Sequence, residues 1–159
     1  MDLPPKLAPD GSIPNLFCVD QTLNIWRGGQ PSDGRAASDL NVRSVIKLNL
    51  ESEGSDDGAE SVGLHVYRFP ISLFWQILFR PSLSKLHAIV DRMRLGACFV
   101  HCEHGQDRTG LAVGCFRLSQ GWSKVDAYLE MIGHGFHYEL QGLQGRWDSL
   151  QPSDWIQTT

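Results

Sequence analysis

The sequence predicts an α/β fold: one domain of three layers, in which a central, mostly parallel sheet of four to five strands has helices on both faces. Three observations support this. Runs rich in β-forming residues alternate with segments of helical periodicity. One run, A-C-F-V-H at 97–101, is continuously apolar, as are strands buried inside a parallel sheet. A length of 159 residues suits a single domain. We expect the domain to cover residues 16–159, after an N-terminal extension over residues 1–15.

In the first half of the chain, turn residues separate short strands from short helices. Strands are expected where Val, Ile, Leu and aromatic residues gather, and Ser or Asp is expected to cap the first helix. The expected elements are a strand ending at Arg27, a turn over 28–31, a helix from Ser32 or Asp33 to Asp39, a strand over 44–50, an acidic loop over 51–58, a helix over 59–62 and a strand over 64–69.

In the second half, apolar positions recur mainly at helical spacing. We interpret the aromatic connection over 70–81 as core packing rather than as a lid. The segment 109–119 is apolar on nearly every side, so we expect its helix in the middle of the domain. The expected elements are a helix from Ser82 to Gly96, a strand over 97–101, a helix over 109–119, a helix capped by Ser123 with Val125, Tyr128, Leu129 and Ile132 on one face, and a helix over 143–150.

Composition and charge exclude several classes of partner. With 42% hydrophobic and 20% charged residues, the composition is that of an ordinary globular protein. The net charge is −4. The chain has no run of Lys or Arg, so we expect neither a nucleic acid nor an anionic membrane as partner. The apolar stretch over 71–79 is interrupted by polar residues and is too short to span a bilayer. The oligomeric state is left open.

The four cysteines, Cys18, Cys98, Cys102 and Cys115, lack the paired spacing of a zinc site and are too few for a disulfide scaffold. If Cys98 and Cys102 share a strand, they lie about 13 Å apart at about 3.3 Å per residue, too far to bridge. The start of the chain also lacks the charged and apolar regions of a signal peptide. We therefore expect a cytoplasmic location.

The stretch H-C-E-H-G-Q-D-R-T-G, residues 101–110, predicts an anion site between a strand and a helix. The helix N-terminus and Arg108 favour the thiolate form of Cys102. Arg108 can hold two oxygens of a phosphoryl group with its planar fork. Cys102 can attack phosphorus in line, and the resulting thiophosphate would then be hydrolysed. We therefore expect phosphate chemistry at this loop.

Two other interpretations of the loop fail. The spacing of Gly105 and Gly110 resembles that of a nucleotide-binding loop, but Leu111 stands where a Lys is required. His101, Cys102 and His104 are too close together along the chain to form a good tetrahedral metal site without a second pair of ligands. We therefore expect no metal and no cofactor.

The motif H-C-E-H-G-Q-D-R-T-G matches the H-C-x5-R-T/S-G signature of the cysteine-dependent protein tyrosine phosphatase superfamily. In size the chain resembles the small, atypical dual-specificity-like members and the phytases of tyrosine-phosphatase type. W-R-G-G-Q-P at 26–31 also looks like the Y-R-S/G-x-Q-P segment of many small members. The resemblance covers about Leu16 to Trp147 and implies the three-layer phosphatase fold.

The resemblance implies roles for several residues of the loop. Cys102 corresponds to the nucleophile and Arg108 to the phosphate-binding arginine. Thr109 corresponds to the hydroxyl that stabilises the thiolate as a leaving group, and His101 to the histidine that orders the loop. The phosphate-binding amides are expected from Glu103, His104, Gly105, Gln106, Asp107 and Arg108.

The chain departs from the family at the general acid. Members usually carry an Asp about thirty residues before the cysteine, but residues 61–90 contain no Asp or Glu. His65 and His87 titrate near neutrality there, and we interpret both as structural. The carboxylates Glu51, Glu53, Asp56 and Asp57 follow a strand whose carboxyl end should lie beside the loop. Our preferred interpretation of that segment is nevertheless a solvated acidic turn.

Asp107 is the first candidate for the acid. Lipid phosphatases of the myotubularin and Sac types carry the same Asp-Arg-Thr order, and their Asp has been considered for this role. The alternative is that Asp107 forms an ion pair or a backbone cap that shapes the loop. A carboxylate beside Arg108 and a helix N-terminus is a poor proton donor, which favours the alternative.

The sequence thus predicts a phosphoric monoester hydrolase of the cysteine-dependent type, acting on a phosphorylated small molecule or protein. The Asp-Arg-Thr order and the resemblance favour an inositol phosphate or phosphoinositide as substrate. Phosphotyrosine or phosphoserine in proteins is the alternative. A phosphate-binding module with little turnover is the alternative of another class. Four basic residues are candidates for a rim around the site: Arg27, Lys47, Arg68 and Arg80.

Overall fold

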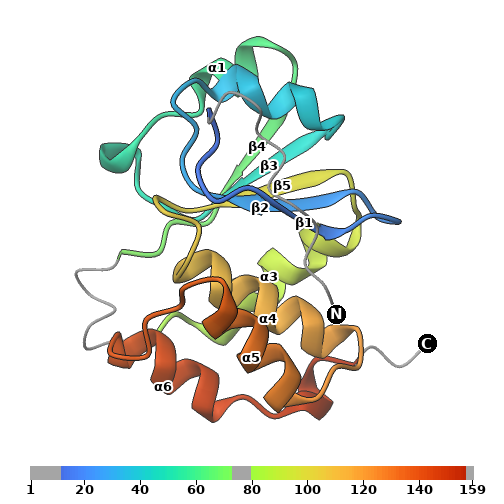
Figure 1. Cartoon of the computed structure of the whole chain (residues 1–159), viewed down its shortest axis with the longest axis vertical. Coiled ribbons are helices and arrows are strands. Elements are labelled where there is room, and N and C mark those ends of the chain that lie inside the picture. Colours follow the sequence, from blue (N-terminus) through green and yellow to red (C-terminus); the bar gives the residue numbers. More distant parts are fainter. Residues whose placement is uncertain (1–11, 73–79, 157–159) are drawn as a thin grey trace.

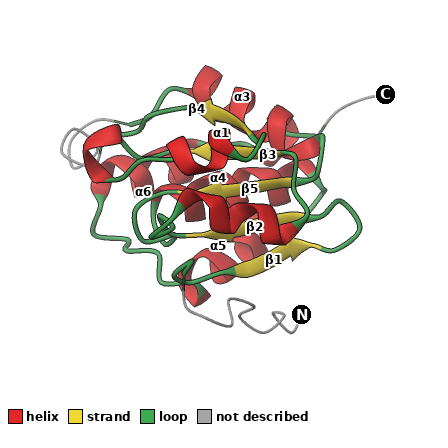
Figure 2. Cartoon of the chain, turned by 90° about the horizontal axis from the view of Figure 1, so that it is seen from above, coloured by secondary structure: helices red, strands yellow, loops and turns green. Residues whose placement is uncertain are grey.

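The computed structural model describes residues 12–72 and 80–156, and within them a five-stranded sheet has the order β1-β2-β5-β3-β4. β1 runs antiparallel to β2, and the other neighbours are parallel. Figure 2 shows the strands side by side in this order. The strands are β1 Phe17–Asp20, β2 Ile25–Gly28, β3 Ser44–Lys47, β4 His65–Arg68 and β5 Cys98–His101.

Helices cover both faces of the sheet (Figure 1). The short helices η1 and α1 pack together on one face, and the longer helices α3 to α6 lie on the other. This arrangement confirms the predicted three-layer α/β fold. The helices are α1 Asp57–Ser61, α3 Leu83–Arg94, α4 Arg108–Ser119, α5 Lys124–Gly133 and α6 Gln141–Ser149, with 3-10 helices η1 Gly34–Leu40, η2 Glu51–Glu53 and η3 Pro152–Asp154.

The sequence missed or misplaced some boundaries. β1 was not predicted, because its four residues F-C-V-D carry little β signal of their own and pair only with β2. β3 ends at Lys47 rather than at residue 50. The interpretation of the connection over 70–81 as core packing falls largely outside the described residues, which omit 73–79.

The strand β5 contributes to two apolar cores, because successive side chains of a strand point to opposite faces. Phe99 packs with the core under η1 and α1, whereas Cys98 and Val100 belong to the larger core beneath α3 to α6. All four residues of β5 are buried, as the continuous apolar run predicted. The strand is therefore fixed from both sides immediately before the loop that follows it.

The helix α4 is buried along its whole length, as predicted from its apolar sequence. The last turn of α4 contains the charged residue Arg117. Its guanidinium donates hydrogen bonds to Glu130 of α5 and to the carbonyl of Val19. At Gly114 the neighbouring helices come so close that an added Cβ would lie 2.7 Å from Met131 Sδ and 2.8 Å from a ring carbon of Trp147.

The apolar residues expected on one face of α5 divide between core and solvent. Tyr128 is partly buried and packs against the core, whereas Val125 and Leu129 are 68% and 62% exposed and Ile132 is also exposed. The side chains that pack on α4 are Ala127 and Met131. Because Ala127 is small, α5 can approach α4 closely on this side. The larger side chains of Val125, Leu129 and Ile132 remain in solvent.

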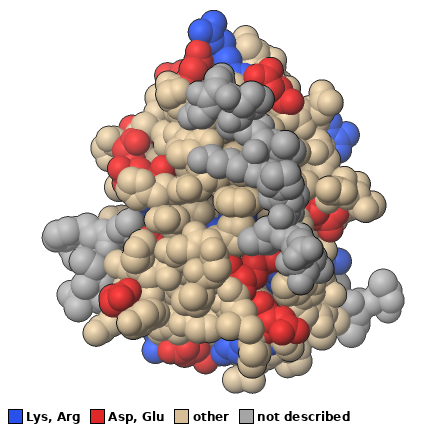
Figure 3. All heavy atoms as spheres, viewed as in Figure 1, with Lys and Arg blue, Asp and Glu red and all other residues tan. Residues whose placement is uncertain are grey.

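Charged side chains are scattered over the face drawn in Figure 3, with no continuous patch of Lys and Arg. None of the helices in the described ranges is both long and apolar enough to cross a membrane.

We expect Gly114→Ala to lower the free energy of unfolding by about 1–3 kcal/mol, because a methyl group at this position overlaps with Met131 and the rigid ring of Trp147. Gly133→Ala is the matched control, since an added Cβ there meets nothing within 4 Å. The control should leave stability unchanged or raise it slightly. Urea unfolding of both variants measures the difference, and equal stabilities would contradict the packing described.

Candidate active site

The segment between β5 and α4, residues 102–107, lies at the carboxyl edge of the parallel strands and is called the phosphate loop below. Gly105 has a φ of +78°, and a Cβ there would lie 2.4 Å from the carbonyl carbon of Gly28. At Gly29 a Cβ would lie 2.7 Å from the carbonyl oxygen of Glu103. The amide of Gln30 donates a hydrogen bond of 2.8 Å to the same oxygen. The motif W-R-G-G-Q-P thus packs directly against the phosphate loop.

Cys102 is the first residue of the loop, and its Sγ accepts a hydrogen bond of 3.3 Å from the amide of Gly105. A backbone N–H directed at sulfur stabilises a thiolate. The other cysteines differ: burial raises the pKa of Cys98 to about 12 and also raises the pKa of Cys115. All four cysteines are free, as expected.

Arg108 begins α4 and is buried. Its Nη1 and Nη2 donate hydrogen bonds of 2.9 and 2.7 Å to the two carboxylate oxygens of Glu53, and Nη1 also bonds the carbonyl of Ile71. The hydrogen bonds from Arg108 lower the pKa of Glu53 to about 2. Nε of Arg108 makes no hydrogen bond to any residue of the described ranges, so this donor remains available to an anion in the loop.

His101 connects the loop to a buried carboxylate. Its Nδ1 donates to the carbonyl of Cys102 at 3.1 Å, and its Nε2 lies 2.5 Å from Oδ2 of Asp56. A carbonyl only accepts hydrogen bonds, and so does an ionised carboxylate. Burial by itself would raise the pKa of Asp56, but the hydrogen bond from His101 holds it below its usual value. Each ring nitrogen of His101 thus has a buried oxygen as its partner, directly before Cys102.

Gln30 completes this polar cluster. Its Nε2 donates 2.7 Å to Oδ1 of Asp56, and its Oε1 accepts hydrogen bonds from Lys47 Nζ at 2.9 Å and from Asn49 Nδ2 at 3.0 Å. Lys47 also donates to the carbonyl of Gly54. The cluster ties the end of β3, the acidic segment and the motif at 26–31 to the histidine before the nucleophile.

These contacts correct the interpretation of residues 51–58 as a solvated turn. Glu51 and Asp57 are exposed, but Asp56 is only 1% exposed and Glu53 is bound to Arg108. The carboxyl end of β3 does lie beside the phosphate loop, as the parallel topology predicted. Two of the four carboxylates are therefore parts of the site.

No family model matches the chain. Among curated proteins, inositol diphosphatase DSP5 of Arabidopsis thaliana is 30% identical over 139 residues, which is 78% of this chain and 67% of that protein. Dual specificity protein phosphatase TpbA of Pseudomonas aeruginosa is 31% identical over 132 residues, 81% of this chain and 58% of that protein. Inositol diphosphatase DSP2 of Oryza sativa is 29% identical over 126 residues, 74% of this chain and 61% of that protein.

The chain belongs to the cysteine-dependent protein tyrosine phosphatase superfamily. It spans 58% to 67% of the length of these curated relatives. The crystal structure of P. aeruginosa TpbA superposes with a TM-score of 0.70 at 23% identity, covering 93% of this chain and 91% of that one. This likeness shows that the phosphatase fold is shared.

The carboxylate of Asp107 contacts His137. Its Oδ1 accepts hydrogen bonds of 2.7 Å from the amide of His137 and 3.0 Å from Nδ1 of the same residue. Asp107 is largely buried and makes no side-chain cap to α4. Its carboxylate is thus turned toward the α5–α6 connection, where it binds His137.

The remaining predicted residues of the loop differ in exposure. Thr109 is fully buried, and its Oγ1 makes no hydrogen bond within residues 12–72 and 80–156. The side chains of His104 and Glu103 are largely exposed, and Glu103 lies 4.0 Å from Arg108. No group of three or more His, Cys, Asp or Glu in the described part of the chain could hold a metal ion.

Arg27, a candidate for the basic rim of the site, supports the phosphate loop instead. It is buried beneath the loop, and its Nη2 donates 3.1 Å to the carbonyl of Gly105. Burial lowers its pKa to about 10. Lys47 is buried as well. Arg68 forms ion pairs with Glu51 and Glu60. The basic rim proposed from the sequence is therefore not formed by these three residues.

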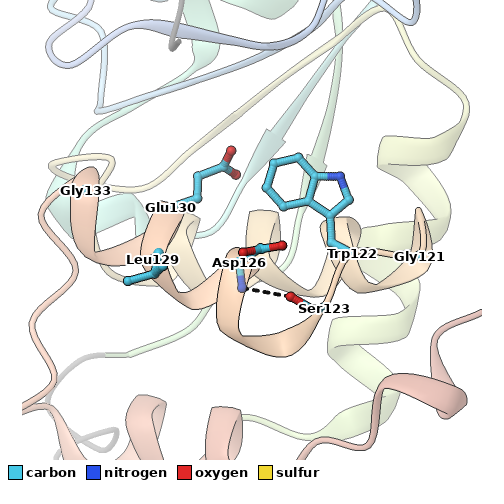
Figure 4. Close-up of a pocket in the computed structure, with 7 residues that line it drawn as sticks. All are labelled: Gly121, Trp122, Ser123, Asp126, Leu129, Glu130 and Gly133. Atoms are coloured by element: carbon cyan, nitrogen blue, oxygen red, sulfur yellow. Dashed lines mark hydrogen bonds between the residues drawn. The ribbon is translucent and has the colours of Figure 1, made fainter. Parts of the chain in front are cut away.

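A separate hollow of about 660 Å³ lies along α5, away from the phosphate loop (Figure 4). Its carboxylate Glu130 is bound to Arg117, whose guanidinium also lies 4.4 Å from the ring centre of Trp122. The hollow contains no cysteine or histidine, and we assign no chemistry to it.

We expect Asp56→Asn to slow alkylation of Cys102 by iodoacetamide at pH 6 by roughly three- to tenfold, because the variant removes the carboxylate that binds His101 directly before the thiolate. Asp57→Asn is the matched control, since this neighbouring carboxylate is exposed. Alkylation rates that are equal in the two variants would contradict the role given to Asp56.

The low pKa of Glu53 predicts an acid-dependent loss of stability. A carboxylate with a pKa of about 2 when folded, against 4.5 ordinarily, stabilises the fold fully above about pH 4.5 and loses this contribution as the pH falls to 2. Glu53→Gln should therefore flatten the decrease in melting temperature between pH 4.5 and 2. The exposed Glu139→Gln is the control, and a Glu53→Gln curve parallel to that of the wild type would refute the prediction.

Proposed function

We propose that the chain hydrolyses phosphate monoesters through a cysteinyl-phosphate intermediate, without needing a metal ion. The observation that carries this proposal is the position of Cys102 Sγ, which receives the amide of Gly105 at the start of a helix that also presents Arg108. A nucleophile and an anion cradle at one helix N-terminus suit phosphoryl transfer.

In this proposal Cys102 attacks phosphorus. Arg108 holds two of the non-bridging oxygens through Nε, which has no partner in the described structure, and through Nη2, which Glu53 then releases. The amides of residues 103–108 bind the remaining negative charge, as backbone donors do in other preorganised sites. His101 keeps the sulfur in its thiolate form. Thr109, buried at the start of α4, would assist departure of the thiolate when water hydrolyses the intermediate.

We propose an inositol phosphate or a phosphoinositide as substrate. Support comes from two curated relatives, one from A. thaliana and one from O. sativa, which are named inositol diphosphatases. The charge around the loop favours a substrate with few phosphate groups, because Lys47 and Arg27 are buried and Arg68 is paired. Hydrolysis of phosphotyrosine or phosphoserine is the second candidate, favoured by the relative named dual specificity protein phosphatase.

The test is a phosphate-release panel of inositol phosphates, phosphoinositides, phosphopeptides and nitrophenyl phosphate. Turnover should be abolished in Cys102→Ser and should decrease on the order of 10²–10³-fold in Arg108→Lys, since a lysine cannot reproduce the two-pronged contact. A phosphate-binding module predicts instead that phosphate binds while none of the substrates is hydrolysed.

A further inference from the structure

The pair Asp107–His137 links the phosphate loop to the connection between α5 and α6. Oδ1 and Oδ2 of Asp107 lie 3.0 and 3.1 Å from Nδ1 of His137. The Asp107 side chain is 12% exposed, whereas that of His137 is 57% exposed. The carboxylate therefore fixes one edge of the imidazole and leaves the other edge open to solvent beside the loop.

The connection that carries His137 is fixed to the loop at three places. Gly135 lies against Gln106, because a Cβ at this glycine would be 2.7 Å from Gln106 Nε2. Phe136 is buried against Gly110. The amide of His137 donates to Asp107 at 2.7 Å. His137 thus has a fixed position relative to Cys102 and Arg108, although it follows them by about thirty residues.

The contact with Asp107 also fixes which nitrogen is protonated. Because an ionised carboxylate only accepts hydrogen bonds, Nδ1 of His137 carries a proton, and Nε2 is the nitrogen that gains or loses one. Asp107 is the charged side chain that hydrogen-bonds this ring in the described structure. A histidine oriented by a carboxylate is a common arrangement for general acid–base catalysis.

The carboxylates near the loop are less suitable as proton donors. Glu53 has a pKa of about 2 because it is bound to Arg108. Asp56 is buried beneath the loop against His101. Asp107 itself is engaged by two groups of His137. The Asp107–His137 pair, in contrast, presents an exposed ring that is neither bound to an arginine nor buried beneath the loop.

We propose that His137 is the general acid–base of this phosphatase and that Asp107 is a positioning residue acting through it. The inference rests on the proposed function. As Cys102 Sγ bonds to phosphorus and the ester P–O bond breaks, Nε2–H of His137 passes its proton to the leaving oxygen. In the second step water attacks phosphorus, gives its proton to Nε2, and the P–S bond breaks to restore the thiolate.

The experiment compares His137→Gln with the wild type on inositol monophosphate, whose alkoxide leaving group needs a proton, and on nitrophenyl phosphate, whose leaving group needs little help. The kcat on the alkyl phosphate should fall on the order of 10²-fold, and that on nitrophenyl phosphate by less than about tenfold. The decrease of kcat at high pH on the alkyl phosphate, caused by loss of the Nε2 proton, should disappear.

Further variants separate catalysis from folding. Asp107→Asn should show the same leaving-group dependence in weaker form, and the double variant should be no slower than His137→Gln alone. Added imidazole should restore alkyl phosphate hydrolysis in His137→Ala, which a purely structural histidine would not allow. His65→Gln is the matched control, since this exposed histidine is the first residue of the edge strand β4 and lies outside the phosphate loop.

Equal loss of kcat on both substrates, or an unchanged pH profile, would overturn the role of His137 while leaving Cys102-dependent turnover in place. If the wild type releases no phosphate that depends on Cys102, the proposed function and this inference both fail.

Discussion

The contact between Asp56 and His101 holds together the parts from which the phosphate loop is built. Both side chains are removed from water, so each charge needs the other as a partner. Asp56 comes from the segment after β3, and His101 is the last residue of β5. Because Gln30 and Lys47 bind the same cluster, three strand ends and the motif at 26–31 are fixed relative to Cys102. The orientation of the thiolate thus depends on a carboxylate 46 positions earlier in the chain.

The second ion pair of the acidic segment has a different consequence. Glu53 binds Nη1 and Nη2 of Arg108, and Nε is left without a partner in the described structure. The guanidinium is thereby held in one orientation, and part of its charge is already neutralised before a substrate arrives. With Arg27 and Lys47 buried, the loop depends on backbone amides for much of its attraction to anions. A site of this kind suits a single phosphate group better than a dense cluster of them.

The sequence predicted those features that depend on local pattern. The continuous apolar run of β5, the all-round apolar helix α4 and the spacing of Cys102 and Arg108 each define their own structure, and the relatives confirm the family. The inward turn of Glu53 and Asp56 was missed, because carboxylates in a Gly- and Ser-rich segment look solvated until their distant partners are known. The face of α5 was missed for a related reason: Ala127 and Met131 match the space beside Gly114, which no helical periodicity reveals. Asp107 was the first candidate for the general acid, but its partner His137 lies outside the motif and could not be foreseen from it.

The burial of α4 also determines how the protein should lose its site on heating. The N-terminus of this helix adjoins the phosphate loop, and every residue of the helix is buried. Local fraying usually begins in exposed segments with few contacts. Here the end of the helix that binds the anion is buried, so the site has no low-energy route of local opening through α4. Thermal inactivation and global unfolding should consequently be one event.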